Sequence, residues 1–428
     1  MAEPSGIYAR RAALQLLDAV LRHGETLDQS FHGATRSVRK PADKALARAL
    51  VSEALRWLPD LDRLIDSATK QNLPDDAKVR SVLRLMLAGW LRLGTPPHAV
   101  IATGLPLLSG GPRRLAHGVF STLNKQEVTL PPIPSLPSPV QQRWAQSCSG
   151  HLSERMESIA AGLAEPPQLD LSLRDPAQSA HWTTQLSGDK LMEGHVRLAR
   201  GSAVENLPGF GSKDQAGAWW VQDLAASIPA RLLGAGEGRY ALDLCAAPGG
   251  KTLQLAAQGW KVTALDISKR RLDLLKQNLQ RVDLKASIIR ADALTWEPKH
   301  QFDAILLDAP CTATGTCRRH PDVLHRIGPR QIAEMAELQT QLIARAAGWL
   351  KPGGQLVYAV CSLEREEGED QAAAVEAAKM DLTPDPIRSD ELPAGLEPTE
   401  QGWLRTDPGM LADAGGLDGF FVARWRKP

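Results

Sequence analysis

The sequence of 428 residues lacks the features of a membrane, exported or zinc-binding protein. No stretch approaches the roughly 18 uninterrupted apolar residues that a membrane span needs. The opening residues, MAEPSGIYARR, contain no apolar segment typical of a secretory signal. Five widely scattered cysteines without a Cys-x-x-Cys pair argue against a disulfide framework and against a zinc site. These absences predict a cytoplasmic protein with reduced thiols, no membrane association and no bound metal.

An excess of one charge is also missing, because 50 Lys and Arg stand against 49 Asp and Glu. The distribution is uneven, however. Residues 1–127 hold 18 basic and 12 acidic residues, a net charge of +6, which leaves −5 for the rest of the chain. A basic smaller domain attached to an acidic larger part is compatible with a partner that carries phosphates. A modest basic excess that serves only solubility is the simpler alternative.

The chain is expected to be multidomain. Residues 1–127 predict an all-α helical bundle, because apolar residues recur at helical spacing in three segments and shorter helices are expected at 97–108 and 112–125. Five prolines in 131-PPIPSLPSP-139 predict an extended linker over 128–139. Residues 140–235 predict a small α+β segment, with a helix near 151–163 and a strand at 168–174.

From residue 236 to 428 the pattern predicts an α/β Rossmann-like domain, since apolar strands alternate with amphipathic helices. The segment 418-DGFFVARWR-426 is expected to add an antiparallel edge strand. The expected strands are 240–245, 262–266, 286–290, 303–308 and 355–360. The expected helices are 249–258, 268–282 and 329–350.

The segment 243-DLCAAPGGKT-252 follows the first of these strands and opens a helix, as a ligand-binding loop would. A phosphate-binding P-loop is disfavoured because Cys245 stands where its first glycine belongs, and the dinucleotide fingerprint G-x-G-x-x-G is absent. S-adenosylmethionine fits better: Gly249 and Gly250 let the backbone approach the cofactor, and a helix N-terminus favours its carboxylate. Three acids at strand ends, each of which alone would be a common cap residue, support this site: Asp266, Asp292 and Asp308.

Two cysteines lie at the ends of neighbouring expected strands, in 308-DAPCTATG-315 and 355-QLVYAVCSLE-364. Carbon 5 of a pyrimidine lacks a lone pair, so its methylation requires a nucleophile to add at C6 first, and a thiolate can do this. That chemistry explains one cysteine, and the second could assist elimination or product release. Either thiol alone would more commonly be a small buried hydrophobe.

The motifs 245-CAAPGGKT-252, 308-DAPCTATG-315, 318-RRHPD-322 and 360-VCSLEREE-367 resemble those of RNA (cytosine-5) methyltransferases, over residues from about 140 to 428. Residues 1–127 resemble the RNA-binding fold of the antitermination factor NusB. The combination is similar to bacterial enzymes that methylate 16S ribosomal RNA. It implies a class I methyltransferase fold, S-adenosylmethionine as cofactor, 16S ribosomal RNA as partner, and action as a monomer.

The resemblance also implies roles for individual residues. Cys361 would be the nucleophile, Cys311 the helper that frees the product, and Asp308 a hydrogen-bond partner of the cytosine edge. Contacts with RNA phosphate are expected from Arg318, Arg319 and His320. The cofactor site would be formed by Cys245, Ala246, Ala247, Pro248, Gly249, Gly250, Lys251, Asp266, Asp292 and Asp308.

Three alternatives remain open at this point. DNA cytosine methyltransferases use the cysteine of the Pro-Cys motif as nucleophile, which would reverse the roles of Cys311 and Cys361. A transfer RNA could be the substrate in place of 16S ribosomal RNA. A non-catalytic RNA-binding or assembly factor could retain a vestigial cofactor pocket.

Overall fold

The computed structural model describes residues 6–146, 152–201, 203–211, 216–378 and 380–428, and its chain divides into two compact units. The first unit comprises Met1–Glu165 together with Cys317–Ile327. The second comprises Pro166–Thr316 and Gly328–Pro428. The chain therefore passes from the second unit into the first and back again between two strands of the main sheet.

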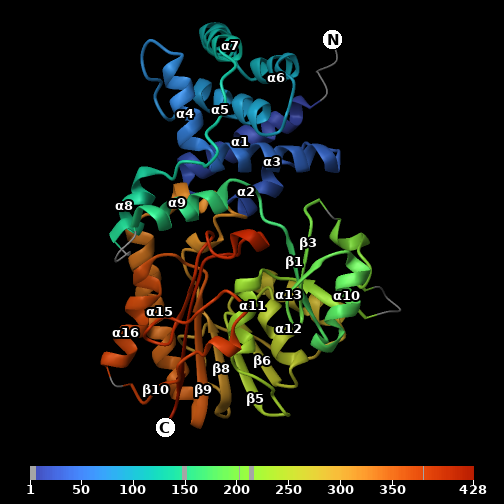
Figure 1. The fold of residues 1–428 in the computed structure, drawn as a ribbon, viewed down its shortest axis with the longest axis vertical. Coiled ribbons are helices and arrows are strands. Elements are labelled where there is room, and N and C mark those ends of the chain that lie inside the picture. The colour runs from blue at the N-terminus through green and yellow to red at the C-terminus, as the bar shows by residue number, and fades with distance from the viewer. Residues whose placement is uncertain (1–5, 147–151, 202, 212–215, 379) are drawn as a thin grey trace. The chain divides into compact units, whose positions relative to one another are not determined.

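The first unit is helical; in Figure 1 its first part is coloured blue to green and its segment Cys317–Ile327 orange. The sequence did not predict α2, α4, α8 or α14, which are all short, and α4 follows α3 after a single residue. The helices of the unit are α1 Ile7–His23, α2 Leu27–Ala34, α3 Pro41–Arg56, α4 Leu58–Ser67, α5 Lys78–Leu91, α6 Pro97–Gly104, α7 Gly110–Lys125, α8 Ser138–Gln146, α9 Leu152–Leu163 and α14 Val323–Arg326.

One apolar core holds helices α1 to α7 together. Its fully buried side chains include Leu16 on α1, Leu50 on α3, Leu83 on α5 and Phe120 on α7. The proline-rich linker is fixed to this bundle, because the backbone N–H of Ser135 donates to the Asp60 carboxylate over 2.8 Å. Residues 128–137 form no helix or strand, α8 begins at Ser138 within the expected linker, and Ser135 is tied to Asp60 of α4.

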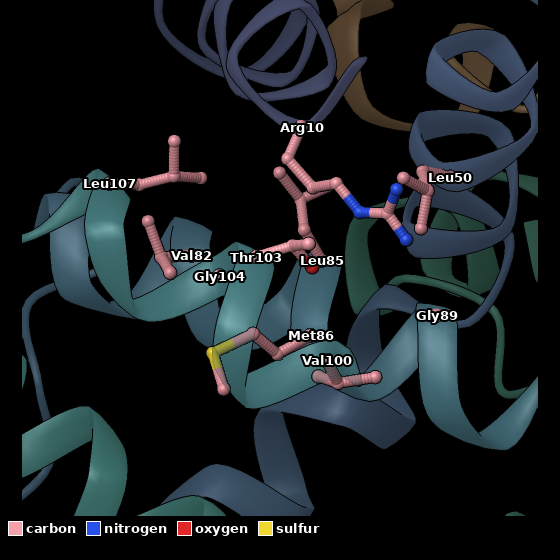
Figure 2. A pocket seen from close by; sticks show the side chains of 10 residues that line it. All are labelled: Arg10, Leu50, Val82, Leu85, Met86, Gly89, Val100, Thr103, Gly104 and Leu107. Carbon is pink, nitrogen blue, oxygen red and sulfur yellow. The ribbon is translucent and has the colours of Figure 1, made fainter. Parts of the chain in front are cut away.

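A small hollow in the bundle is lined mostly by apolar side chains of α1, α3, α5 and α6. Figure 2 shows Arg10 reaching toward Leu50 beside Met86 and Val100. The hollow holds about 10 Å³, room for a single water at most. It is a packing gap of the helical core and too small for a ligand.

The segment Cys317–Ile327 is bound to the helical unit by polar contacts as well as by α14. Nε2 of His325 lies 2.7 Å from the carbonyl oxygen of Leu55, and Arg56 donates to the carbonyl oxygen of Arg318 over 2.9 Å. Burial lowers the pKa of His325 to about 4. The neutral imidazole is thus the form that this packing favours.

The second unit begins with a small antiparallel sheet in the order β2-β3-β1-β4. Asp170 on β1 accepts two hydrogen bonds from Arg197 on β3, of 2.6 and 2.7 Å, and a third from the backbone N–H of Leu224 over 3.0 Å. This buried ion pair joins the small sheet to helix α11. The elements are β1 Leu169–Leu173, α10 Ser179–Leu186, β2 Asp189–Met192, β3 His195–Leu198, β4 Trp219–Val221 and α11 Leu224–Arg231.

The main sheet has the order β10-β12-β9-β8-β5-β6-β7, with β11 paired to β12. Strands β5 to β9 are parallel, and β12 is antiparallel to β9. The predicted antiparallel orientation of the last segment is thus confirmed, but its edge position is wrong because β10 and β11 pair along its outer side. The strands are β5 Tyr240–Leu244, β6 Lys261–Asp266, β7 Ser287–Arg290, β8 Phe302–Asp308, β9 Leu350–Val360, β10 Thr383–Pro384, β11 Leu404–Thr406 and β12 Phe420–Arg426.

Helices cover both faces of this sheet, as Figure 1 shows for α11 to α13 and for α15 and α16. On β5 the buried residues alternate: Leu242 belongs to a core with Ile343 of α15, whereas Ala241 belongs to a core with Ile228 of α11. This alternation is what a parallel sheet buried on both faces requires. The helices are α12 Gly250–Ala257, α13 Lys269–Arg281, α15 Pro329–Trp349 and α16 Glu369–Ala377.

The predicted strands and helices of the main sheet are all present, within a few residues of their expected bounds. The fold class is therefore confirmed: a helical bundle, a small antiparallel sheet and a mostly parallel α/β sheet. Within the described parts of the chain, no helix is both long and apolar enough to span a membrane.

Candidate active site

The strand order reverses between β5 and β8, because the chain runs outward through β6 and β7 before it returns to the other side of β5. In open α/β sheets ligands bind at the carboxyl ends of the strands next to such a reversal. The registers pair Leu244 of β5 with Leu265 of β6 and with Leu307 of β8. Consequently the next residues, Asp266 and Asp308, end their strands on either side of Cys245.

The loop after β5 has a backbone that few residues tolerate. Cys245 has φ 60° and Gly249 has φ 111°, just before α12 begins at Gly250. A Cβ atom on Gly249 would lie 2.9 Å from Cγ of Leu275 on α13. Glycine at this position therefore allows both the turn and the close approach of α13.

Asp266 is buried and fixes this loop from β6. Its carboxylate accepts the backbone N–H of Ala247 over 3.2 Å and that of Ser268 over 2.8 Å. Asp292 lies two residues beyond β7, is exposed, and accepts the N–H of Leu294 over 2.9 Å. Both acids thus sit at strand ends as expected, and Asp292 also serves its local turn.

Lys251 and Asp308 join the cofactor loop to β8. The Nζ atom of Lys251 lies 2.7 Å from the Asp308 carboxylate and 5.2 Å from the ring centre of Phe420. Little of the lysine is exposed, whereas about a third of the Asp308 side chain is open to solvent. Asp308 is therefore held in place while still accessible to a ligand.

The two cysteines of the sequence motifs are brought together. Asp308 pairs with Ala359 across the parallel strands β8 and β9, so Cys311 and Cys361 leave the sheet at the same level. Their Sγ atoms are 3.5 Å apart. The hydrogen bond between the thiols, together with burial, raises the pKa of Cys311 well above its ordinary value. Cys311 is thus held as a thiol that can donate to Cys361.

The other cysteines have different surroundings. Burial, reinforced by the nearby carboxylates of Asp266 and Asp308, raises the pKa of the Cys245 thiol, which makes it a poor nucleophile. Cys317 is buried and belongs to the helical unit. Cys148 lies outside the described residues.

The sequence did not single out two acids of this region as site residues. Asp243 on β5 is fully buried, accepts the Thr252 hydroxyl over 2.5 Å, and has its pKa raised by burial to about 7. Glu367, six residues beyond Cys361, is also fully buried. Both look like ordinary surface or cap acids in the sequence, and only the fold shows their burial.

The expected RNA-contacting residues belong to the segment that packs with the helical unit. Arg318 is 3% exposed, so little of its side chain can meet a phosphate. Arg319 is exposed, and His320 is half-buried with Nδ1 3.9 Å from the Asp28 carboxylate. Of the three, Arg319 is the one that the structure leaves at the surface.

Known protein families match both parts of the chain. A family model described as "16S rRNA methyltransferase RsmB/F" matches residues 230–426, and the NusB family model matches residues 8–107. A ribosomal RNA small subunit methyltransferase B of Klebsiella pneumoniae is 34% identical over 98% of this chain and 98% of its own. The chain belongs to the RsmB/F family of 16S rRNA methyltransferases. The resemblance drawn from its motifs is thereby confirmed.

The fold is also found among solved structures. The structure of PH0851 matches over 100% of both chains with a TM-score of 0.74 and 21% identity. That of NSun6 from Pyrococcus horikoshii covers 68% of this chain and 98% of its own, with a TM-score of 0.55 and 20% identity. As a member of the RsmB/F family, the protein is an S-adenosylmethionine-dependent enzyme that methylates a cytosine of 16S rRNA. The second and third alternatives above, a transfer RNA enzyme and a vestigial factor, are set aside by this membership.

Proposed function

We propose that this RsmB/F member methylates carbon 5 of its cytosine through a covalent bond between Cys361 and C6 of the base. The observation that carries this proposal is the pair of thiols 3.5 Å apart beyond the ends of β8 and β9, together with Asp308 at the end of β8, whose side chain is about a third exposed. One thiol can attack while its neighbour remains a hydrogen-bond donor. An enzyme that methylates nitrogen or oxygen would need neither.

In the first step the Cys361 thiolate adds to C6, and the ring electrons move toward N3. Asp308 would hydrogen-bond the cytosine edge and favour protonation of N3 as the electrons reach it, and Lys251 keeps the carboxylate in place. The C5=C6 double bond is thereby converted into an enamine whose C5 is nucleophilic. This divides one difficult substitution into easier steps.

The residues around the loop after β5 fit S-adenosylmethionine. Asp266 would receive the ribose hydroxyls, Asp292 the adenine edge, and the start of α12 the methionine carboxylate. The backbone from Cys245 to Lys251, with Asp308, would complete the site. When bound, the cofactor supplies the electrophilic methyl group that C5 takes up.

Release of the product requires two bonds to break. The proton on C5 leaves to a base, and its bonding electrons restore the double bond as the bond between C6 and sulfur breaks. Cys361 departs as a thiolate, and the S–H of Cys311 would stabilise it by donating a hydrogen bond. Cys311 thus has a role that only this covalent route demands.

We further propose that the basic domain 1–127 and the segment 140–235, joined by the linker 128–139, deliver RNA to the catalytic domain 236–428. Exposed Arg319 would contact an RNA phosphate. Because every proposed catalytic residue comes from one chain, a monomer is sufficient. Four free cysteines among the described residues agree with a reducing, cytoplasmic location.

A denaturing gel with 16S rRNA and cofactor would test the two thiols. Cys311→Ala is expected to accumulate a covalent RNA–protein band, since Cys361 attacks but is not released. Cys361→Ala is expected to give no band and no methyl transfer. A band with Cys361→Ala that disappears in Cys311→Ala would show the reversed roles of the DNA enzymes, and no band with either variant would refute the covalent route.

A further inference from the structure

Glu367 lies six residues beyond Cys361, at the end of the single turn Arg365–Glu367, and its side chain is 0% exposed. A buried carboxylate is costly unless hydrogen-bond donors surround it. Four donors do so here, which is the number that an ionised carboxylate accommodates well. These donors are the ones that an anion needs, and they offset part of the effect of burial, which raises the pKa of Glu367.

The four donors come from both cysteine loops and from α15. Thr312, the residue after Cys311, donates its backbone N–H to Oε2 over 2.9 Å and its hydroxyl to Oε1. Ser362, the residue after Cys361, donates its hydroxyl to Oε1 over 2.8 Å. Gln339 of α15 donates to Oε2 over 3.0 Å. One side chain thus connects the residues that directly follow the two thiols.

Gln339 also holds the residue on the other side of Cys311. Its Nε2 atom also donates to the carbonyl oxygen of Pro310 over 2.8 Å, and the residue is 0% exposed. Cys311 is therefore flanked on both sides by residues held by Glu367 and Gln339. The Cys361 loop has further support, because its carbonyl oxygen accepts the N–H of Gly315 over 3.0 Å.

We propose that Glu367 is a positioning residue that holds Cys311 against Cys361 and so acts in the release of the methylated RNA. The proposal rests on the covalent route described above and deepens it. Two of the four hydrogen bonds to the carboxylate come from Thr312 beside Cys311, and a third comes from Gln339, which also binds Pro310, so loss of Glu367 acts mainly on that thiol. Cys361, which continues directly from β9, keeps its place and can still attack.

The charge of Glu367 also supports the role of Cys311 in release. The titratable groups that influence Cys311 are Cys361, Glu367 and Tyr358, while Arg405 is the nearby cation and binds the Ser362 carbonyl. An anion beside Cys311 disfavours its thiolate. The carboxylate therefore helps to keep Cys311 protonated, as a donor to the departing Cys361 sulfur requires.

The experiment compares Glu367→Gln with Glu366→Gln, a matched change at the exposed neighbouring acid. On the denaturing gel with 16S rRNA and cofactor, Glu367→Gln is expected to accumulate the covalent band. The rate of multiple turnover is expected to fall about 10- to 100-fold, because a small misplacement of a catalytic group lowers a rate by that much. Glu366→Gln is expected to behave as the parent. Addition of Cys361→Ala to Glu367→Gln is expected to abolish the band.

Alkylation of Cys311 as a function of pH separates this role from general support of the fold. In Glu367→Gln the midpoint of Cys311 alkylation, followed by mass spectrometry, is expected to move to lower pH. A loss of global stability that leaves Cys311 beside Cys361 would change the rate without moving the midpoint. If Glu367→Gln does not fold, Gln339→Met removes one donor and the Pro310 contact, and the same band is expected from it.

The outcomes keep this proposal distinct from the covalent route itself. If Cys311→Ala accumulates the band but Glu367→Gln and Gln339→Met turn over without it, Glu367 has no part in release. Activity lost in Glu367→Gln without any band also overturns the proposal, since attack by Cys361 would then have failed as well. If Cys311→Ala gives no band, the covalent route fails first.

Discussion

The two halves of the strand-end site are held in different ways. On the β5–β6 side, the cofactor loop is fixed mainly by its own backbone: Gly249 at φ 111° and the N–H of Ala247 on Asp266. On the β8–β9 side, the cysteine loops are fixed by side chains from several elements that converge on Glu367. Local geometry shapes the first half, and tertiary packing shapes the second.

This difference follows from what each half must do. A loop that approaches a bound cofactor through its backbone needs small residues and unusual dihedral angles, which a short segment can supply by itself. Two thiols that act in sequence must be kept at one separation although they lie fifty residues apart, and a shared partner such as Glu367 adds to the pairing of β8 with β9 in doing so. Substitutions in each half should therefore have separable effects on cofactor binding and on chemistry.

The largest expected effect is that of Asp308→Asn, because Asp308 lies between the halves. The variant keeps the size of the side chain but loses the charge that pairs with Lys251 and that assists the cytosine ring. Methyl transfer is expected to fall at least about 100-fold, the lower range for loss of an acid–base group. Single-turnover transfer of labelled methyl to 16S rRNA would measure it.

Asp303→Asn provides a matched control on the same strand. Asp303 near the other end of β8 also pairs with a lysine, Lys351, over 2.8 and 2.9 Å. Loss of that pair is expected to leave single-turnover methyl transfer within about 3-fold of the parent, since surface pairs contribute little. Equal losses from both substitutions would mean that Asp308 acts only through the stability of β8.

The same difference between the halves decides what the sequence could predict. The cofactor half could be predicted from the sequence, because its glycines and acids stand at fixed offsets from strands with a clear apolar pattern. These residues are Gly249, Gly250, Asp266 and Asp308. The strand alternation itself follows from burial on both faces. The fold class, the strands β5 to β9 and β12, and the helices α12, α13 and α15 were therefore predicted. The strands β2 to β4, β10 and β11 and the helices α2, α4, α8, α10, α11, α14 and α16 were not.

The cysteine half could be predicted from the sequence only in part. The sequence shows both thiols, but nothing in it says that Glu367 is buried or that Gln339 reaches Pro310 from α15. Nor does the charge run at 318–320 show that Arg318 is 3% exposed. Such facts depend on contacts between distant segments, and periodicity carries no information about them.

Gly249→Ala should disturb the cofactor half alone. The new Cβ would meet Leu275 and force a residue other than glycine into φ 111°, at a cost of about 1 to 3 kcal/mol. The dissociation constant of S-adenosylmethionine, measured by calorimetry, is expected to rise about 10-fold or more, since 1.4 kcal/mol is a factor of ten. The covalent RNA band in a Cys311→Ala background should still form.

Gly259→Ala is the matched control for this substitution. Gly259 follows α12, has φ 85°, and its nearest neighbour for a new Cβ is the N atom of Glu237 at 3.6 Å. It carries similar backbone strain without the clash with α13. Cofactor affinity is expected to stay within about 2-fold of the parent, because the strain is not transmitted to the loop. A similar loss in both variants would place the cause in general destabilisation.

Asp243→Asn should have the smallest effect on methyl transfer and a clear effect on stability. Burial raises the pKa of Asp243 to about 7, so the folded protein retains a proton that the unfolded chain releases at lower pH. The contribution of Asp243 to the free energy of unfolding therefore falls as pH rises from about 4 to 7 and is lost above that range. Asparagine reproduces the neutral form and can still accept the Thr252 hydroxyl. Above pH 7 the variant is expected to melt at a higher temperature than the parent, with the difference vanishing near pH 4.

Asp303→Asn is the control, and above pH 7 it is expected to melt at a lower temperature than the parent. The reason is that Lys351 and the Tyr240 N–H outweigh partial burial and lower the pKa of Asp303. A parent and an Asp243→Asn variant with parallel melting curves from pH 4 to 8 would mean that Asp243 is ionised in the fold, and that the anion beside the cofactor loop is tolerated there.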